Sequence, residues 1–186
     1  MKFNNHSYLQ GQHAFLSASR YHWINYDEEK LDTRYIKHLA TVRGTELHEF
    51  ASEAIRLGIK LPRVKKTLNM YVNDAIGYNM EPEQVLFYSD NAFGTADAIK
   101  FKKGLLRTHD LKTGVTKTSM HQLEVYNGLF CLEYQVKPEE IDFENRIYQN
   151  DEVLIAKPTP EEIRFIMDKI ITFDKRIEKL KLGVWV

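Results

Sequence analysis

Residues 93–126 constrain the fold more than any other stretch of the sequence. They read FGTADAIKFKKGLLRTHDLKTGVTKTSMHQLEVY, which indicates a strand, a turn at Lys103-Gly104, a second strand, a polar loop and a helix. A two-residue loop at this turn places Asp97 directly opposite Asp110, with Cβ atoms about 5 Å apart. A four-residue loop gives the same register, whereas a three-residue loop spoils it. Facing carboxylates destabilise a sheet unless a cation lies between them, so the hairpin predicts a divalent-metal site.

Lys112 follows the second of these aspartates by two residues. Side chains alternate between the faces of a strand, so Asp110 and Lys112 share one face. Beside a metal-bound phosphate, a lysine can orient or deprotonate the attacking water or stabilise developing negative charge. The metal lowers the pKa of that water and polarises the phosphate. Asp97, Asp110 and Lys112 therefore outline a metal-dependent catalytic site for phosphodiester cleavage.

The composition excludes several other classes of protein. Lys and Arg number 26, as do Asp and Glu, so the chain is not a strongly basic polyanion-binding protein. Cys131 is the only cysteine, which excludes a disulfide framework, a cysteine-ligated zinc site and a four-cysteine iron–sulfur cluster. There is no apolar leader and no apolar run of membrane-spanning length. We expect a single domain over residues 1–186 in a cytoplasmic, soluble protein.

The periodicity of the remaining chain predicts an α/β fold. The expected elements are a short helix from Ser17 or Ser19 to Ile24, helices at 31–57, 62–77, 119–134 and 160–182, and strands at 85–89, within 93–112, and at 143–149 and 153–156. Gly44 marks either a break or a close contact within the second helix. The order ααα βββ α ββ α predicts a central mixed β-sheet flanked by helices.

These motifs together resemble a known group of enzymes. Asp97, the run Asp110-Leu111-Lys112-Thr113-Gly114 and the pair Gln122-x-x-x-Tyr126 are similar to the signature of the PD-(D/E)xK nuclease superfamily, in its RecB-like exonuclease branch. This branch includes relatives of the lambda-type exonucleases and the CRISPR-adaptation nucleases. Upstream, the segments 43–49 (RGTELHE) and 16–19 (LSAS) resemble two further motifs of the branch. The resemblance covers residues 16–126 and implies a restriction-endonuclease-like core.

The resemblance implies a role for each matching residue. The metal, Mg²⁺ or Mn²⁺, would be bound by His48, Asp97, Asp110 and the backbone carbonyl of Leu111. Lys112 would be the catalytic lysine. Gln122 and Tyr126 would position the substrate backbone or the lysine. The cysteines that hold an iron–sulfur cluster in several relatives are absent, so we expect no cluster.

Most of these residues also have structural interpretations. His48 alone fits a partly buried helix histidine, Asp97 fits a charge at a strand edge, and Asp110 with Lys112 fits a surface ion pair. Those alternatives do not explain two facing aspartates. Ser119-x-x-Gln122 is also a capping box, so Gln122 either caps its own helix or joins the site.

Other residues leave two interpretations open. Thr113 and Lys117, in the polar loop 113–117, are placed to contact phosphate, although loops commonly have this composition. His109 points away from the aspartates and is expected to be structural. His121 is either a surface residue or a phosphate contact. Two larger groups also have two interpretations. One group is a solvated face or flanks a DNA groove, and consists of the basic residues Lys60, Arg63, Lys65 and Lys66. The other packs in the core or stacks on unpaired bases, and consists of the aromatic residues Tyr21, Trp23 and Tyr26.

The expected function is a metal-dependent DNA nuclease, an exonuclease that acts on DNA ends or single strands. The resemblance implies work in recombination, repair or replication, alone or with partner proteins, and in the host cytoplasm if a phage encodes the chain. The alternatives are an endonuclease or RNA nuclease with the same site, and a non-catalytic DNA-binding subunit on a nuclease fold. The oligomeric state stays open.

Overall fold

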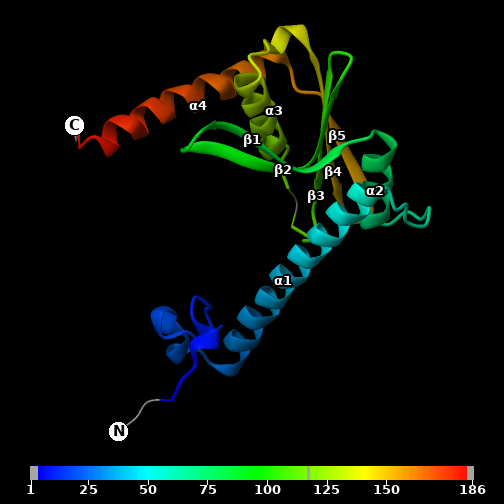
Figure 1. Cartoon of the computed structure of the whole chain (residues 1–186). Coiled ribbons are helices and arrows are strands. Elements are labelled where there is room, and N and C mark those ends of the chain that lie inside the picture. The colour runs from blue at the N-terminus through cyan, green and yellow to red at the C-terminus, as the bar shows by residue number, and fades with distance from the viewer. Residues whose placement is uncertain (1–3, 117, 184–186) are drawn as a thin grey trace. The chain divides into compact units, whose positions relative to one another are not determined.

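The computed structural model describes residues 4–116 and 118–183 and has an α/β fold with a five-stranded mixed sheet (Figure 1). The chain divides into two compact units, Met1–Arg43 and Gly44–Val186. That residues 1–186 act as one nuclease domain stays a prediction. In chain order the elements are η1 (Ser7–Leu9), η2 (Ala18–Asn25), α1 (Glu28–Leu57), α2 (Thr67–Gly77), β1 (Glu81–Ser89), β2 (Ala92–Lys102), β3 (Leu105–Leu111), α3 (His121–Glu133), η3 (Pro138–Glu140), β4 (Asp142–Gln149), β5 (Glu152–Ala156) and α4 (Pro160–Lys181).

The sheet has the strand order β1-β2-β3-β4-β5. Neighbouring strands run antiparallel except β3 and β4, which are parallel and are connected through α3. A parallel pair needs such a crossover because the chain has to return to the starting end of the sheet before the second strand begins. The predicted order of elements is therefore confirmed, with the difference that the first short helix is of the 3-10 type.

The register of the β2–β3 hairpin is the predicted one. Lys102 pairs with Leu105, and the pairing continues to Ala98 opposite His109. Lys103 and Gly104 at the turn have φ angles of 52° and 76°. A two-residue primed turn has positive φ at both central positions, and its twist matches that of the strands. The turn therefore fixes the register that the site depends on.

Two apolar layers enclose the sheet of residues 44–186. On one side, the C-terminal part of α1 and α2 pack against Ala98, Leu111 and Tyr148. The other layer is formed by α3 and α4, which pack against Leu106 and Phe143. Ala98 is completely buried, so its small side chain lets the helices approach the strand closely.

The prediction that Pro62 opens a helix is wrong. The chain bends through residues 62–66, and α2 begins at Thr67. The reason is a partner distant in sequence: Asp151, in the turn between β4 and β5, accepts hydrogen bonds from the Thr67 backbone N–H at 2.9 Å and from the Lys66 Nζ at 2.8 Å. A carboxylate at the first turn satisfies exposed N–H groups and the helix dipole, and a local pattern cannot reveal it.

Helix α1 begins at Glu28, three residues before the predicted start, and continues through Gly44 without a break. Asp27 accepts a hydrogen bond from the backbone N–H of Lys30 at 2.8 Å and so caps the helix. Gly44 marks a close contact instead of a break. A Cβ atom at this position would lie 2.9 Å from the Thr113 Oγ1, which requires one of the two residues to move.

Helix α4 begins as its sequence indicates. Thr159 and Glu162 form a reciprocal capping box, and Pro160 occupies the first turn. Across residues 4–116 and 118–183, none of the helices combines the length and the apolarity that crossing a membrane requires.

Candidate functional site

Three carboxylates occupy adjacent positions on three neighbouring strands. Asp97 on β2 follows the last hydrogen-bonded pair of the hairpin, so its position in the register is opposite Asp110 on β3. On the other side, Pro82 pairs with Ala98 and Gln84 with Ala96, which leaves Glu83 of β1 opposite Asp97. The sheet therefore brings Glu83, Asp97 and Asp110 together side by side.

His48 completes this group from α1. Its Nδ1 lies 3.4 Å from the Asp97 Oδ2. Potential ligand atoms of His48, Glu83 and Asp97 all lie within 4.8 Å of one another. Asp110, the other side-chain ligand that the resemblance implies, lies on the next strand, where Lys112 contacts it. Its role as a ligand stays a prediction.

Glu83 was not predicted as a site residue. Its backbone has a φ of 53°, in the left-handed region that residues other than glycine rarely adopt. Strain of this kind costs about 1–3 kcal/mol and is common where a side chain has to be aimed at a functional site. The sequence offered one weak signal, a carboxylate directly after a proline at the start of the first strand.

The environment of Asp97 disfavours the ionised form of its carboxyl group. Burial, followed by repulsion from Asp110, raises the pKa of Asp97 to about 6, although His48 acts in the opposite direction. Its Oδ2 accepts a hydrogen bond of 2.8 Å from the Leu111 backbone N–H. This bond crosses the hairpin and fixes the carboxylate in place. A bound cation would relieve the remaining repulsion.

Lys112 lies next to Asp110 on the face that the sequence predicted. The Lys112 Nζ is 3.0 Å from both carboxylate oxygens, and it donates a hydrogen bond to Oδ1. The Oδ2 atom is buried without a hydrogen-bond partner in the described part of the chain. Burial raises the pKa of Asp110, and the lysine counteracts this shift. The Lys112 ammonium therefore compensates Oδ2 by an ion pair, while its hydrogen bond goes to Oδ1.

Gln122 and Tyr126 continue this chain of contacts from α3. The Gln122 Oε1 accepts a second hydrogen bond from Lys112 Nζ at 2.8 Å, and Gln122 Nε2 donates to the Tyr126 hydroxyl at 2.9 Å. The interpretation of Gln122 as a helix cap is wrong, because Met120 is the N-cap and no side chain caps the helix. A Cβ on Gly94 would lie 2.9 Å from the Tyr126 ring, so glycine leaves space for the tyrosine.

These residues fit a divalent metal ion. Hard cations take carboxylate oxygens, and a histidine nitrogen is compatible with Mn²⁺ and similar ions. His48, Glu83 and Asp97 offer three converging potential ligand atoms, and Asp110 offers a buried carboxylate oxygen on the adjacent strand that accepts no hydrogen bond from the described residues. The Leu111 backbone N–H is used by Asp97, and ligation by the Leu111 carbonyl stays a prediction.

The remaining predicted substrate contacts lie in the loop after β3. Thr113 lines a cavity of about 220 Å³ that opens beside Lys112. Lys117 is outside the described residues. Gln149 of β4 was not predicted, yet its Nε2 donates to the backbone carbonyls of Gly114 at 2.5 Å and Thr116 at 2.8 Å. It therefore ties the loop to the sheet, which no local pattern indicates.

His109 lies away from the site, as predicted. It is completely buried against the rings of Tyr78 and Tyr148. Burial, with Arg146 and Arg107 nearby, lowers the pKa of His109 to about 3. The imidazole is thus neutral at ordinary pH and belongs to the core.

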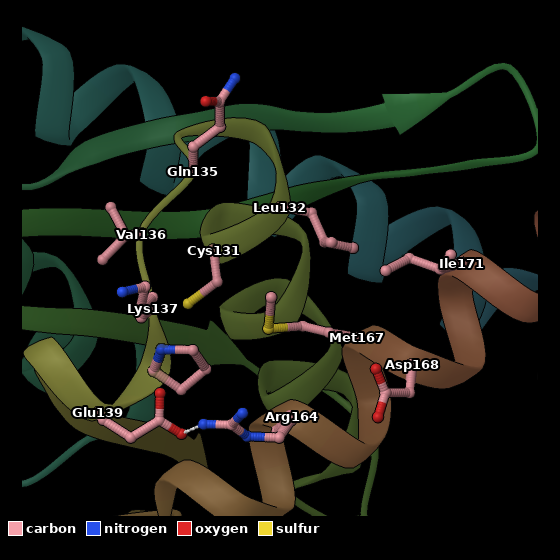
Figure 2. Close-up of a pocket in the computed structure, with 11 residues that line it drawn as sticks. Cys131, Leu132, Gln135, Val136, Lys137, Glu139, Arg164, Met167, Asp168 and Ile171 are labelled. Atoms are coloured by element: carbon pink, nitrogen blue, oxygen red, sulfur yellow. Dashed lines mark ion pairs between the residues drawn. The ribbon is translucent and has the colours of Figure 1, made fainter.

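A separate cavity of about 550 Å³ lies between α3, η3 and α4 (Figure 2). Its apolar wall includes Cys131 and Met167, and an ion pair between Arg164 and Glu139 lies at its rim. Burial raises the pKa of the Cys131 thiol to about 12, so the thiol stays protonated and is a poor nucleophile at neutral pH. Glu83, Asp97 and Asp110 do not line this cavity.

Comparison of the chain with protein-family models, with curated proteins and with solved structures gave no match. The resemblance to the PD-(D/E)xK nucleases therefore stays a prediction from the motifs.

Proposed function

We propose that the site of Glu83, Asp97, Asp110, His48 and Lys112 hydrolyses phosphodiester bonds of DNA with a divalent metal ion. One observation carries this proposal: converging carboxylates and a histidine lie beside a lysine that two other side chains hold in place. A purely structural role leaves the adjacent carboxylates of Glu83, Asp97 and Asp110 without explanation, because like charges on neighbouring strands repel.

The protein side chains divide the work between them. His48, Glu83, Asp97 and Asp110 would hold Mg²⁺ or Mn²⁺, which when bound activates water and polarises the phosphate. An ammonium group has three N–H donors, and Lys112 uses two of them on Asp110 and Gln122. With Asp110 Oδ2 bound to the metal, the third donor would be left to orient the attacking water or to stabilise charge on a phosphate oxygen. Tyr126 fixes Gln122, which in turn fixes the lysine.

The choice of DNA and of an exonuclease rests on the motifs. The order His48, Asp97, Asp110-x-Lys112 and Gln122-x-x-x-Tyr126 resembles that of the RecB-like branch. His48 lies on α1, the two aspartates on β2 and β3, Lys112 directly after β3, and Gln122 and Tyr126 on α3. On this proposal the five-stranded mixed sheet is a restriction-endonuclease-like core, and the biological setting is DNA recombination, repair or replication.

The test is cleavage of end-labelled linear DNA with Mg²⁺ and with EDTA. We expect degradation that depends on the metal and is abolished in Lys112→Ala and Asp97→Ala. Lys102→Ala and Asp90→Ala are matched controls, because they remove the same charges from exposed positions of the same sheet region. Circular dichroism checks that all four variants fold. Wild-type cleavage by Lys112→Ala would disprove the assignment.

The substrate used in the cleavage assay distinguishes the exonuclease from the endonuclease, the RNA nuclease and the non-catalytic subunit. A circular single strand stays intact with an exonuclease and is cut by an endonuclease, while a labelled RNA tests for an RNA nuclease. Absence of metal-dependent cleavage on every substrate would favour a non-catalytic DNA-binding subunit.

A further inference from the structure

The N-terminal unit, Met1–Arg43, contains a pocket of its own. Its volume is about 380 Å³, within the range of pockets that bind small organic ligands. Every described residue that lines it lies between positions 13 and 41, so the pocket belongs to this unit alone. Its chemically distinctive lining residues are Phe15, Arg20, Trp23, Tyr26, Arg34 and Lys37.

The pocket is positively charged. Arg34 and Lys37 are one turn apart on the same face of α1, and Arg20 comes from η2. None of the described lining residues is acidic. Within residues 4–116 and 118–183, these three cations form no ion pair. Unpaired cations that converge from two elements make a site for an anion.

Aromatic rings form another part of the same lining. Phe15, Trp23 and Tyr26 are half-buried there. The Trp23 Nε1 donates a hydrogen bond to the Ser17 carbonyl at 3.0 Å, which fixes the orientation of the indole.

Two of these three rings contact other side chains of the protein. Phe15 packs edge-on against Tyr35, with ring centroids 5.0 Å apart, and the Lys30 ammonium lies 4.8 Å from the centre of the Tyr26 ring. By contrast, no other described ring or cation packs on Trp23. Trp23 lines the pocket without such a contact, so it is the ring on which we expect a planar ligand to stack.

We propose that this pocket binds one unpaired nucleotide of single-stranded DNA, with the base on Trp23 and the phosphate on Arg34 and Lys37. Aromatic stacking tolerates every base and basic side chains track the backbone, which is the chemistry of sequence-independent single-strand binding. The inference rests on the proposed function only for the choice of DNA as the polymer. Binding here needs neither the metal nor the carboxylates.

Tryptophan fluorescence can follow this binding directly. The chain has two tryptophans, so Trp185→Phe leaves Trp23 as the only one, and excitation at a wavelength that tyrosine does not absorb selects its emission. Titration of the full-length protein with ten-residue oligothymidylate in EDTA should quench the emission. A matched pair of variants isolates the pocket: Arg34→Ala removes a lining arginine, whereas Arg43→Ala removes an arginine of the same helix that does not line it. We expect about tenfold weaker binding for the first and less than a twofold change for the second, since one lost phosphate contact is worth about 1.4 kcal/mol.

Each contrary result overturns a defined part of the proposal. Absence of quenching, or equal loss of affinity in both arginine variants, overturns the pocket. Equal quenching by an abasic strand of the same length overturns base stacking. Binding of thymidine monophosphate as tight as that of the oligonucleotide identifies a free-nucleotide site and overturns strand binding. Quenching in EDTA without any cleavage in Mg²⁺ keeps this inference and rejects the nuclease, whereas cleavage without quenching does the reverse.

Discussion

The substitution Asp97→Asn should make the metal-free protein more stable while it removes metal binding. The folded-state pKa of Asp97 is about 6 and its ordinary value is 3.8. Ionisation of this group is therefore harder in the folded than in the unfolded chain. Each pKa unit corresponds to about 1.4 kcal/mol, so the charged carboxylate costs the fold about 3 kcal/mol above pH 6. Asparagine has the same size and can still accept the hydrogen bond from the Leu111 N–H.

The sign of the pH dependence follows from the raised pKa. In the wild type this group destabilises the fold progressively as the pH rises from about 4 to about 6. The advantage of Asp97→Asn should thus be absent at pH 3.5 and complete at pH 7.5. Urea unfolding in EDTA, followed by circular dichroism at both pH values, measures it. Added Mg²⁺ should then stabilise the wild type and leave the variant unchanged, because ligands stabilise only the state that binds them.

Asp151→Asn is a control for which we expect the opposite change in the free energy of unfolding. Lys66 and the Thr67 N–H lower the pKa of Asp151, so its charge stabilises the fold above pH 4. Removal of that charge should lower stability at pH 7.5. If Asp97→Asn is no more stable than the wild type in EDTA at pH 7.5, the explanation by buried, repelling carboxylates is refuted.

Three further substitutions test other contacts. Gly94→Ala should reduce cleavage strongly because the added Cβ meets the Tyr126 ring, whereas Gly77→Ala, with open space around it, should leave the rate unchanged. Tyr126→Phe removes the hydroxyl that anchors Gln122 and should lower cleavage severalfold with little change in the urea midpoint. Asn127→Ala leaves two buried partners without hydrogen bonds and should cost about 2 kcal/mol in urea unfolding.

Local patterns predicted the parts of the site that are close in sequence. The hairpin register follows from the turn at Lys103-Gly104 and from strand alternation, which act over a few residues. The start of α4 is equally local, because Pro160 marks the first turn of that helix in the sequence and occupies it in the structure.

Contacts between distant segments were missed for the same physical reason. Glu83 joins the site only because β1 pairs with β2 in a particular register and bends at that residue. Asp151 reaches the start of α2 from 84 residues away, so Pro62 was mistaken for the helix start. The side chain of Gln122 matched two patterns, and only the position of Lys112 in space decides between them.

The left-handed backbone at Glu83 has a consequence for how molecules of this chain meet one another. Strand β1 lies at the border of the sheet and exposes Val85 and Phe87, a combination that invites a strand from another molecule to pair with it. Pro82 lacks an N–H group, and the adjacent distortion interrupts the extended backbone. An incoming strand therefore cannot form a continuous ladder along this border. Valine favours extended backbone, so Glu83→Val should straighten β1 and increase aggregation at high protein concentration.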